Sequence, residues 1–427
     1  MVHDHAVVSF DDERVVANAG VVLPVVLASR LGMVDLVDEW LSLGNVPGAA
    51  NVGRKVGSIV HAMTLGADSI DDCAVLRAGQ TEAVLGFAAA APSTLGTFLR
   101  AFTFGHVRQL DRVLAELLRR AWAAGAGPGD QRLVVDVDSF VGQTHGYEKR
   151  GASFGYSGIR GYHPLIATRA DTGEVLHVRF RRGSSNTAKG VLRFVDELLP
   201  RLDRAGASGE KLLRADSGFW NNTLMNKLAA AGWLYSIGAR MQKPVRAVVE
   251  AIPDEAWTTL EDYPKTGVAQ IAETTFNGRR LIVRRVRLLG AQDEMFPQWR
   301  HFPFLTNRTD PIKVVEKEHR QHAVVELSIR DLKDQGLAHF PSGKFNANGA
   351  WTVLAAIAHN LLRWTQTLGL PGTTIRTART MRDRLLSVPA RLTRHGRQLR
   401  LSMPARWPWA QQFLTALGRL RALAPPG

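Results

Sequence analysis

The sequence is almost without cysteine: Cys73 is the only one among 427 residues. A single thiol excludes an intramolecular disulfide and a cysteine-rich zinc module. Long hydrophobic runs are missing too, because residues 15–29 are too short to span a bilayer and are interrupted by Asn18, Gly20 and Pro24. The first residues lack the basic and then apolar segments of a secretory signal. We therefore expect a protein of the reducing cytoplasm with no membrane segment.

The composition bounds the class of protein. Hydrophobic residues make up 45% of the chain and charged residues 22%, which is typical of a soluble globular protein and not of a disordered one. A chain of 427 residues is too long for one simple core, so we expect two or three domains.

Positive charge is in excess and is unevenly spread. The formal net charge is +15, yet acidic residues outnumber basic ones in residues 1–130, so the excess lies in the remainder of the chain. Such an asymmetry indicates a polyanionic partner for the later part, and nucleic acid is the usual one. The alternative explanation is the arginine-rich composition that a GC-rich genome produces.

Hydrophobic periodicity changes along the chain and predicts an α/β core with a β-rich insertion. The helical spacing in residues 93–120 fits either a helix-turn-helix unit that binds DNA ends or ordinary helix packing. A Gly- and Pro-containing linker follows it. The expected segments are a helical N-terminal domain at 1–125, the first part of the core at 130–233, the insertion at 234–307, the last part of the core at 308–370 and a basic helical tail at 371–427.

Carboxylates occupy informative places on three separate segments. Asp136 and Asp138 lie two apart in the strand-like run LVVDVDSF and therefore point to one face of that strand. Asp216 ends a second apolar run, LLRADSGF, where Ser-Gly turns the chain outward. Glu326 lies inside the helical run KEHRQHAVVELSIRDLK.

The helix that carries Glu326 has two stripes of side chains. The apolar stripe consists of Val325, Ile329 and Leu332, and the polar stripe consists of His319, His322, Glu326, Arg330 and Lys333. A polar face of this kind meets either a ligand or solvent, and in the second case Glu326 and Arg330 form an i,i+4 pair. A zinc site of His319, His322 and Glu326 is a further alternative, although the His-Glu-x-x-His motif is absent.

Carboxylates gathered from separate segments suit hard divalent cations. Mg²⁺ takes oxygen ligands and keeps several waters, so two or three carboxylates are enough to hold it. Two such ions about 3.5–4 Å apart can activate an attacking oxygen and stabilise the leaving oxygen of a phosphodiester. The surrounding positive charge would bind the phosphate backbone.

In this order and spacing the residues resemble the DDE transposases of bacterial insertion sequences. An Asp on a first strand, the Asp of RADSGF and a helical Glu followed seven residues later by Lys carry the resemblance, which covers roughly residues 130–370. The gaps, 216 − 138 = 78 and 326 − 216 = 110, suit the subgroup with a β insertion before the Glu. The resemblance implies a ribonuclease-H-like core that this insertion interrupts.

Two positions depart from the signature of that subgroup, which is Tyr, Arg, Glu and Lys at fixed spacing. His319 and His322 stand in the place of Tyr and Arg, whereas Glu326 and Lys333 match. Arg320 is close in sequence, but it points about 100° away from His319 on a helix. For the first carboxylate the family pattern favours Asp138 before Ser139, and Asp136 is the alternative.

The resemblance implies an activity, a cofactor and partners. It implies that Asp138, Asp216 and Glu326 hold two Mg²⁺ ions, for which Mn²⁺ can substitute. The reaction would cut the inverted-repeat ends of an insertion sequence and join them to target DNA, with double-stranded DNA as partner and a homodimer pairing the two ends. The expected DNA contacts are His319, Arg320, His322, Arg330, Lys333, Arg376, Arg379, Arg391 and Arg394. A different metal-dependent nuclease on the same core and a non-catalytic DNA-binding protein remain alternatives.

Two further features invite a DNA-related interpretation. The segment from Arg376 to Arg400 holds eight arginines and one aspartate, so it is either a phosphate-contacting arm or a solvated pair of surface helices. Trp257 and Trp299, in the insertion, are candidates for stacking on a flipped base of the kind that hairpin-forming relatives extrude. A core position is the more common role for a tryptophan and is the alternative for both.

Overall fold

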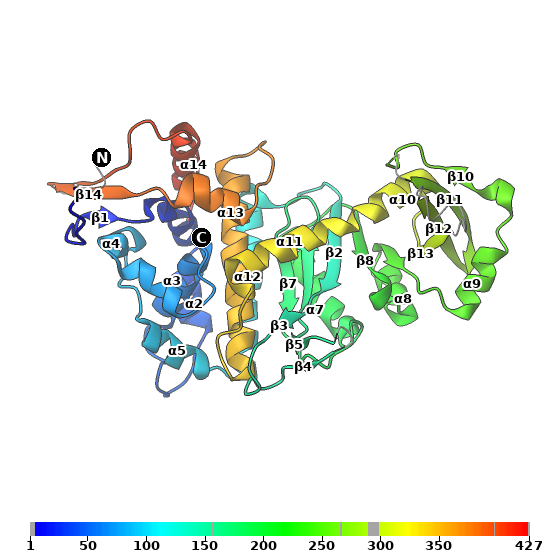
Figure 1. The fold of residues 1–427 in the computed structure, drawn as a ribbon, viewed down its shortest axis with the longest axis horizontal. Helices are drawn as coiled ribbons and strands as arrows, with labels where there is room; N and C mark the ends of the chain where they lie inside the picture. Colours follow the sequence, from blue (N-terminus) through cyan, green and yellow to red (C-terminus); the bar gives the residue numbers. More distant parts are fainter. Residues whose placement is uncertain (1–4, 156–157, 265–266, 289–298, 397, 426–427) are drawn as a thin grey trace. The chain divides into compact units, whose positions relative to one another are not determined.

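The computed structural model describes all residues except 1–4, 156–157, 265–266, 289–298, 397 and 426–427 (Figure 1). The chain divides into two compact units. Unit 1 comprises Met1–Ala126, Gly146–Arg150 and Asp331–Gly427, and unit 2 comprises Gly127–His145 and Gly151–Arg330. The segment boundaries expected within the core, at 233, 307 and 370, stay a prediction.

Unit 2 is built on a nine-stranded mixed sheet with the strand order β10-β11-β12-β13-β9-β8-β2-β6-β7. Its strands are β2 (Leu133–Ser139), β6 (Leu165–Arg169), β7 (Val175–Arg179), β8 (Lys211–Ala215), β9 (Leu234–Gly238), β10 (Thr258–Thr259), β11 (Gly267–Phe276), β12 (Arg279–Leu288) and β13 (Arg300–Thr306). A second, small sheet holds β3 (Gly142–Gln143), β5 (Arg160–Tyr162) and β4 (Ser153–Phe154).

Strand direction changes at β2. This strand pairs antiparallel with β6, which pairs antiparallel with β7. On its other side β2 pairs parallel with β8, and β8 pairs parallel with β9. Parallel strands need helical crossovers, and here these are α7 (Val191–Ala205) between β2 and β8 and α8 (Asn222–Ala230) between β8 and β9.

The insertion strands continue the same sheet, because β13 pairs antiparallel with β9 and leads on to β12, β11 and β10. Alternate side chains of these strands, among them Ile271 and Ile282, form a buried cluster with Val315 of α10 (Ile312–Arg320). The helix α9 (Lys243–Glu250) lies within the range expected to be β-rich and packs on β11. The insertion therefore shares one sheet with the rest of unit 2.

The helical run that carries Glu326 is less regular than its spacing predicts. It forms α10, then a 3₁₀ turn at Gln321–Ala323, then α11 (Val324–Leu332). The boundary between the two units falls inside α11. The apolar stripe of Val325, Ile329 and Leu332 is buried as predicted, which leaves Glu326 on the exposed side.

Unit 1 is mostly helical. Its helices are α1 (Val22–Arg30), α2 (Met33–Trp40), α3 (Val52–Thr64), α4 (Thr81–Leu85), α5 (Pro92–Arg100), α6 (Phe104–Ala121), α12 (Phe345–Gly369), α13 (Ala378–Met381) and α14 (Ala410–Ala422). The long helix α12 is buried on nearly all sides, with Trp351 and Trp364 fully enclosed, and packs against α3, α6 and α14. Burial on nearly all sides places this helix in the centre of unit 1.

The C-terminal tail is not helical throughout, which corrects the expected helical tail. Residues 390–402 form an antiparallel hairpin of β14 (Ala390–His395) and β15 (Gln398–Ser402), and β14 also pairs with β1 (Val15–Val16). Leu392 and Leu401 alternate with polar residues and join a small apolar cluster with Val16, so burial of that face favours strand over helix. Gly396, with φ of +59°, supplies the left-handed residue of the turn.

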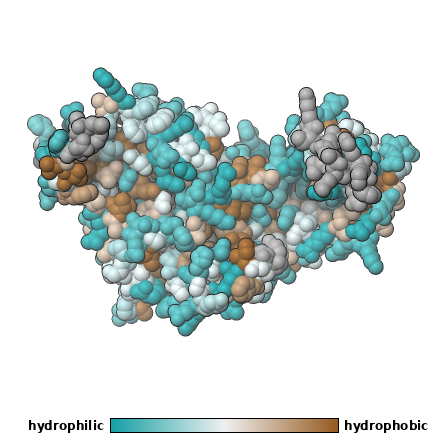
Figure 2. Space-filling model, in the orientation of Figure 1, coloured by the Kyte–Doolittle hydropathy of each residue, from teal (hydrophilic) through white to brown (hydrophobic). Residues whose placement is uncertain are grey.

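Hydrophilic residues cover most of the face that Figure 2 displays, and hydrophobic residues appear there as scattered patches. Among the described residues, no single helix is long and apolar enough to cross a membrane. One bent pair, Ala19–Arg30 with Met33–Trp40, meets that test by length and composition only when its two helices are taken together.

Candidate active site

Two of the predicted carboxylates lie at the adjoining ends of neighbouring parallel strands. In the register of β2 and β8, Asp136 pairs with Arg214 and Val137 pairs with Ala215. Asp138 and Asp216 each follow directly on this register, so the two carboxylates leave the same edge of the sheet. Ligand sites of α/β sheets form at such carboxyl ends.

Asp138 is half-buried and sits in an acidic environment. Its Oδ1 accepts a hydrogen bond from the backbone N–H of Ser139 at 2.6 Å. Burial raises the pKa of Asp138 to about 6, and the negative charges of Asp216 and Glu326 add to this, whereas the Ser139 N–H and His322 oppose it. The structure thus brings Asp216 and Glu326 within electrostatic reach of Asp138.

A tight turn presents Asp216. Its Oδ1 accepts a hydrogen bond from the backbone N–H of Gly218 at 2.9 Å and caps the 3₁₀ turn Ser217–Phe219, and the residue is exposed. The turn is pressed against β9, because a Cβ on Gly238 would lie 2.7 Å from the Ser217 backbone nitrogen. Only glycine at position 238 permits this approach.

Asp136 lies in a different environment from Asp138, although both are on β2. It is completely buried, and its two oxygens accept hydrogen bonds from Nε and Nη2 of Arg214, both at 2.7 Å. His322 Nδ1 lies 2.8 Å from Asp136 Oδ1. Both oxygens of Asp136 therefore already have protein partners, whereas Asp138 and Asp216 each receive a single backbone hydrogen bond.

Arg214 is the member of this network that the sequence analysis missed. It is 2% exposed and donates from Nη1 to the backbone carbonyl of Glu318 in α10, besides its bond to Asp136. The network residues precede the carboxylates at short spacing: Asp136 and Arg214 come two residues before Asp138 and Asp216, and His322 comes four before Glu326. The network of Asp136, Arg214 and His322 therefore links the three elements that carry the carboxylates. The sequence signal that could have identified Arg214 is a charged residue within an otherwise apolar strand run.

His319 is held as a neutral ring. Its imidazole stacks on Phe304, with ring centroids 4.0 Å apart, and hydrogen-bonds with the Ser236 hydroxyl at 2.8 Å. Burial, aided by the positive neighbours His322 and Arg214, lowers the pKa of His319 to about 3. At neutral pH His319 carries no positive charge for a phosphate, so this position supplies stacking and not a cation.

A cleft of about 850 Å³ opens beside the carboxylates within unit 2. Its lining includes Asp216, Glu326, Arg240, Arg284, Arg320 and Phe302. Arg240 Nε donates to the Ser217 carbonyl at 3.1 Å, and Arg320 pairs with Asp262 at 2.9 Å at the cleft wall. The carboxylate of Glu316 also lines the cleft and pairs with Arg284 at 3.6 Å and with Arg320 at 3.4 Å. Arginines in such a lining would let the cleft accept a phosphodiester chain. Arg240 and Arg284 were not singled out from the sequence.

The other predicted DNA contacts fall into several environments. Arg330 is exposed on α11, and Lys333 is half-buried at the start of the unit 1 segment. Arg376 is engaged inside unit 1, where its Nη1 donates to Gln412 Oε1 at 3.0 Å, while Arg379 is exposed. Arg391 and Arg394 are exposed on the β14–β15 hairpin.

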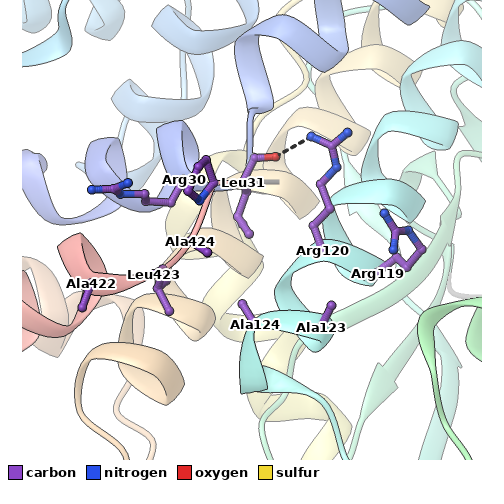
Figure 3. Close-up of a pocket in the computed structure, with 10 residues that line it drawn as sticks. Arg30, Leu31, Arg119, Arg120, Ala123, Ala124, Ala422, Leu423 and Ala424 are labelled. Carbon is purple, nitrogen blue, oxygen red and sulfur yellow. Dashed lines mark hydrogen bonds between the residues drawn. The ribbon is translucent and has the colours of Figure 1, made fainter. Parts of the chain in front are cut away.

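A second cavity, of about 420 Å³, lies in unit 1 (Figure 3). Arg30, Arg119 and Arg120 line it together with alanines, and Arg120 donates to the backbone carbonyl of Leu31 at 2.9 Å. Arg119 and Arg120 also share one carboxylate, that of Glu116. None of the described residues that line this cavity carries a carboxylate, so its described lining differs from that of the cleft.

The donor set of the acidic cluster fits a hard divalent cation. Asp138, Asp216 and Glu326 offer only oxygen ligands, which Mg²⁺ and Mn²⁺ accept. Repulsion from Asp216 and Glu326 contributes to the raised pKa of Asp138, and a cation among the three groups would relieve that repulsion. The His319 ring is engaged by Ser236 and Phe304, which does not suit the zinc alternative.

Comparison with known proteins adds one match over the whole chain. A family model described as transposase DDE domain group 1 matches residues 2–425. No curated protein matches. Among solved structures, the chain is similar to one in a cryo-electron microscopy structure of a piggyBac transposase synaptic complex with hairpin DNA. The TM-score is 0.45 and the identity 10%, over 86% of this chain and 79% of that chain.

Proposed function

The chain belongs to the transposase DDE domain group 1 family, and from this premise we propose that it cuts the inverted-repeat ends of an insertion sequence and joins them to target DNA. The observation that carries the proposal is the cluster of Asp138, Asp216 and Glu326, which interact electrostatically where two parallel strands end. The order β7-β6-β2-β8-β9, with β2, β8 and β9 parallel, supports a ribonuclease-H-like core for the site.

Asp138, Asp216 and Glu326 would hold two Mg²⁺ ions, or Mn²⁺ in their place. When bound, the ions supply an activated attacking oxygen and charge stabilisation at the phosphodiester. The raised pKa of Asp138 means that this carboxyl must lose its proton to serve as a ligand, which becomes easier as the pH rises above 6. Asp136 is proposed as a positioning residue, because Arg214 and His322 occupy its oxygens.

The cleft arginines would hold the DNA strand for attack. Arg240, Arg284 and Arg320 line the same cleft as Asp216 and Glu326, so a backbone lying along the cleft would place one phosphate at the carboxylates. In the first step water attacks the phosphodiester and releases a 3′-OH. In the second step that 3′-OH attacks a target phosphodiester, so one phosphodiester forms as another breaks. A homodimer would hold both element ends.

The test is excision from a donor plasmid that carries the protein's own element with its flanking DNA. We expect Asp138→Ala, Asp216→Ala and Glu326→Ala to abolish Mg²⁺-dependent cleavage, since each removes a metal ligand. Glu255→Ala removes an exposed carboxylate of unit 2 and serves as the matched control. Full activity of the Asp216 or Glu326 variant would contradict the assignment of these residues as metal ligands.

Two outcomes would select the alternatives. Cleavage without joining of the ends to a target plasmid would make the protein a nuclease on the same core. DNA binding by the wild-type protein without any Mg²⁺-dependent nicking would make it a non-catalytic binder. Strand transfer is therefore measured alongside cleavage in the same reactions.

A further inference from the structure

The β14–β15 hairpin, hereafter the ribbon (residues 390–402), has a packed base and an exposed tip. At the base, Leu392 lies opposite Leu401 in the apolar cluster of unit 1. Beyond them the described residues from Thr393 to Leu399 are exposed, and Leu399 is 53% exposed. A two-stranded hairpin without a buried face is marginal in water, so this tip suits an external partner.

The ribbon is cationic, and its sequence surroundings lack acidic residues. Arg391, Arg394 and Arg400 are all exposed, and no Asp or Glu occurs from Arg384 to the last residue. The nearest acidic partner belongs to the segment before β1, where Asp12 pairs with Arg391 at 3.3 Å. An exposed pair of this kind contributes little to stability, so a phosphate could displace Asp12 at little cost.

The pairing register divides the arginines between the two faces of the ribbon. Arg391 and Thr393 are two residues apart on β14 and therefore point to the same face. Arg400 pairs with Thr393, so it lies on that face as well. Arg394 pairs with Leu399 on the opposite face. Cations on both faces suit a partner that surrounds the ribbon with negative charge on two sides, and a flat surface would engage only one of them.

We propose that the ribbon enters the major groove of duplex DNA, with Arg400 and Arg394 facing the two phosphate walls. Three residues beyond Leu392 reach about 10 Å at roughly 3.3 Å per residue, which matches a groove about 8.5 Å deep and 12 Å wide that admits a two-stranded ribbon. Figure 1 shows the orange hairpin extending away from the helices of unit 1. The inference deepens the proposed function and rests on it only for the choice of DNA as partner.

The experiment measures binding of the full chain to a 30-bp duplex of mixed sequence in EDTA, by fluorescence anisotropy over a range of salt. We expect the double variant Arg394→Ala with Arg400→Ala to raise Kd about tenfold and to lower the log Kd–log salt slope by roughly 2, since each lost phosphate contact removes about 0.9. The variant Asp12→Asn removes the carboxylate that competes with phosphate for Arg391. We expect it to lower Kd about twofold.

A matched control and a second readout separate groove binding from general charge loss. Arg54→Ala with Arg419→Ala removes the same charge from exposed positions of α3 and α14, and we expect less than about a twofold change in Kd. Wild-type protein should protect guanine N7, a major-groove atom, from methylation, and the ribbon variant should lose that protection while Lys at both positions restores it.

The outcomes distinguish this inference from the proposed function. Unchanged Kd, salt slope and N7 protection in the ribbon variant would overturn the ribbon proposal, even if the wild-type protein cuts and joins DNA. Equal loss of affinity for single-stranded DNA would also overturn groove binding. Ribbon-dependent duplex binding by a wild-type protein that never nicks DNA would instead remove the proposed function and leave the ribbon proposal intact.

Discussion

Asp136 and Arg214 form a buried, two-point ion pair across neighbouring parallel strands, two residues before Asp138 and Asp216 respectively. Arg214 also reaches the Glu318 carbonyl, and His322 reaches Asp136. The pair therefore connects both aspartate strands to the helical run that bears the third carboxylate. Its place in the fold indicates a role in positioning the three carboxylates that we propose as metal ligands.

Arg214→Met should damage both stability and activity. It leaves Asp136 buried without its partner, and breaking a buried ion pair by removing one member costs about 3–5 kcal/mol. We expect a lower urea unfolding midpoint and loss of DNA cleavage.

The double variant Asp136→Leu with Arg214→Met separates the two effects, because removing both charges avoids the uncompensated one. The unfolding midpoint should recover most of its value, whereas cleavage should stay low and require more Mn²⁺ for half-maximal rate. Recovery of cleavage with wild-type metal dependence would show that the pair only stabilises the fold.

Metal-free stability should depend on the protonation of Asp138. Its folded pKa of about 6 lies above the ordinary value of 3.8, so the folded state binds a proton that the unfolded state has released between these pH values. Stability from this group is therefore full below pH 4 and lost as the pH rises through 6, by at most roughly 3 kcal/mol. Asp138→Asn should raise the melting temperature in EDTA at pH 7.5 and leave it unchanged near pH 4.

The exposed Asp130→Asn serves as the control for loss of a carboxylate and should not change the pH profile. Added Mg²⁺ should stabilise the wild-type protein at pH 7.5 and not the Asp138→Asn variant. A variant that melts below the wild type at pH 7.5 in EDTA would contradict the repulsion inferred among the three carboxylates.

The sequence indicated where Asp138 and Asp216 lie better than it indicated the residues that support them. Asp138 and Asp216 could be found because each ends an apolar strand run, and parallel neighbours bring such ends together. The ion pair of Asp136 with Arg214 could not be predicted from the sequence, because it depends on the strand register, which no local pattern encodes. The same limit explains His319: its place in a polar stripe predicted a ligand-facing group, whereas Phe304, on a separate strand, makes it a stacked and neutral ring.

The fold was predicted where local periodicity decides structure and missed where distant pairing does. The change of periodicity along the chain predicted an α/β core, which the mixed sheet with its helices confirms, and the apolar stripe on α11 predicted its buried face. The β14–β15 hairpin was expected to be helical, because its arginines favour helices and its pairing with Val15–Val16 joins opposite ends of the sequence. Tertiary burial of Leu392 overrides that local preference.

Gly238→Ala should impair cleavage by displacing the turn that presents Asp216. The new Cβ would lie 2.7 Å from the backbone nitrogen of Ser217, and backbone cannot move aside as a flexible side chain can. We expect cleavage to fall at least about tenfold, because a catalytic group displaced by 1 Å can cost roughly a hundredfold in rate. Gly418→Ala on α14 is the control: its Cβ meets open space, so it should stabilise that helix by up to about 1 kcal/mol. Unchanged cleavage by Gly238→Ala would mean that the turn can shift without moving the carboxylate.

His319→Phe should be tolerated and His319→Arg should not. Phenylalanine keeps the stack on Phe304 and loses only the hydrogen bond with Ser236, worth about 1 kcal/mol. Arginine would place a charge where burial already lowers the imidazole pKa to about 3, so the cation would be forced out of the site or left unpaired. Cleavage and melting temperature of the two variants test this ordering. If His319→Arg cuts DNA faster than the wild type, position 319 acts as a phosphate contact and not as a stacking group.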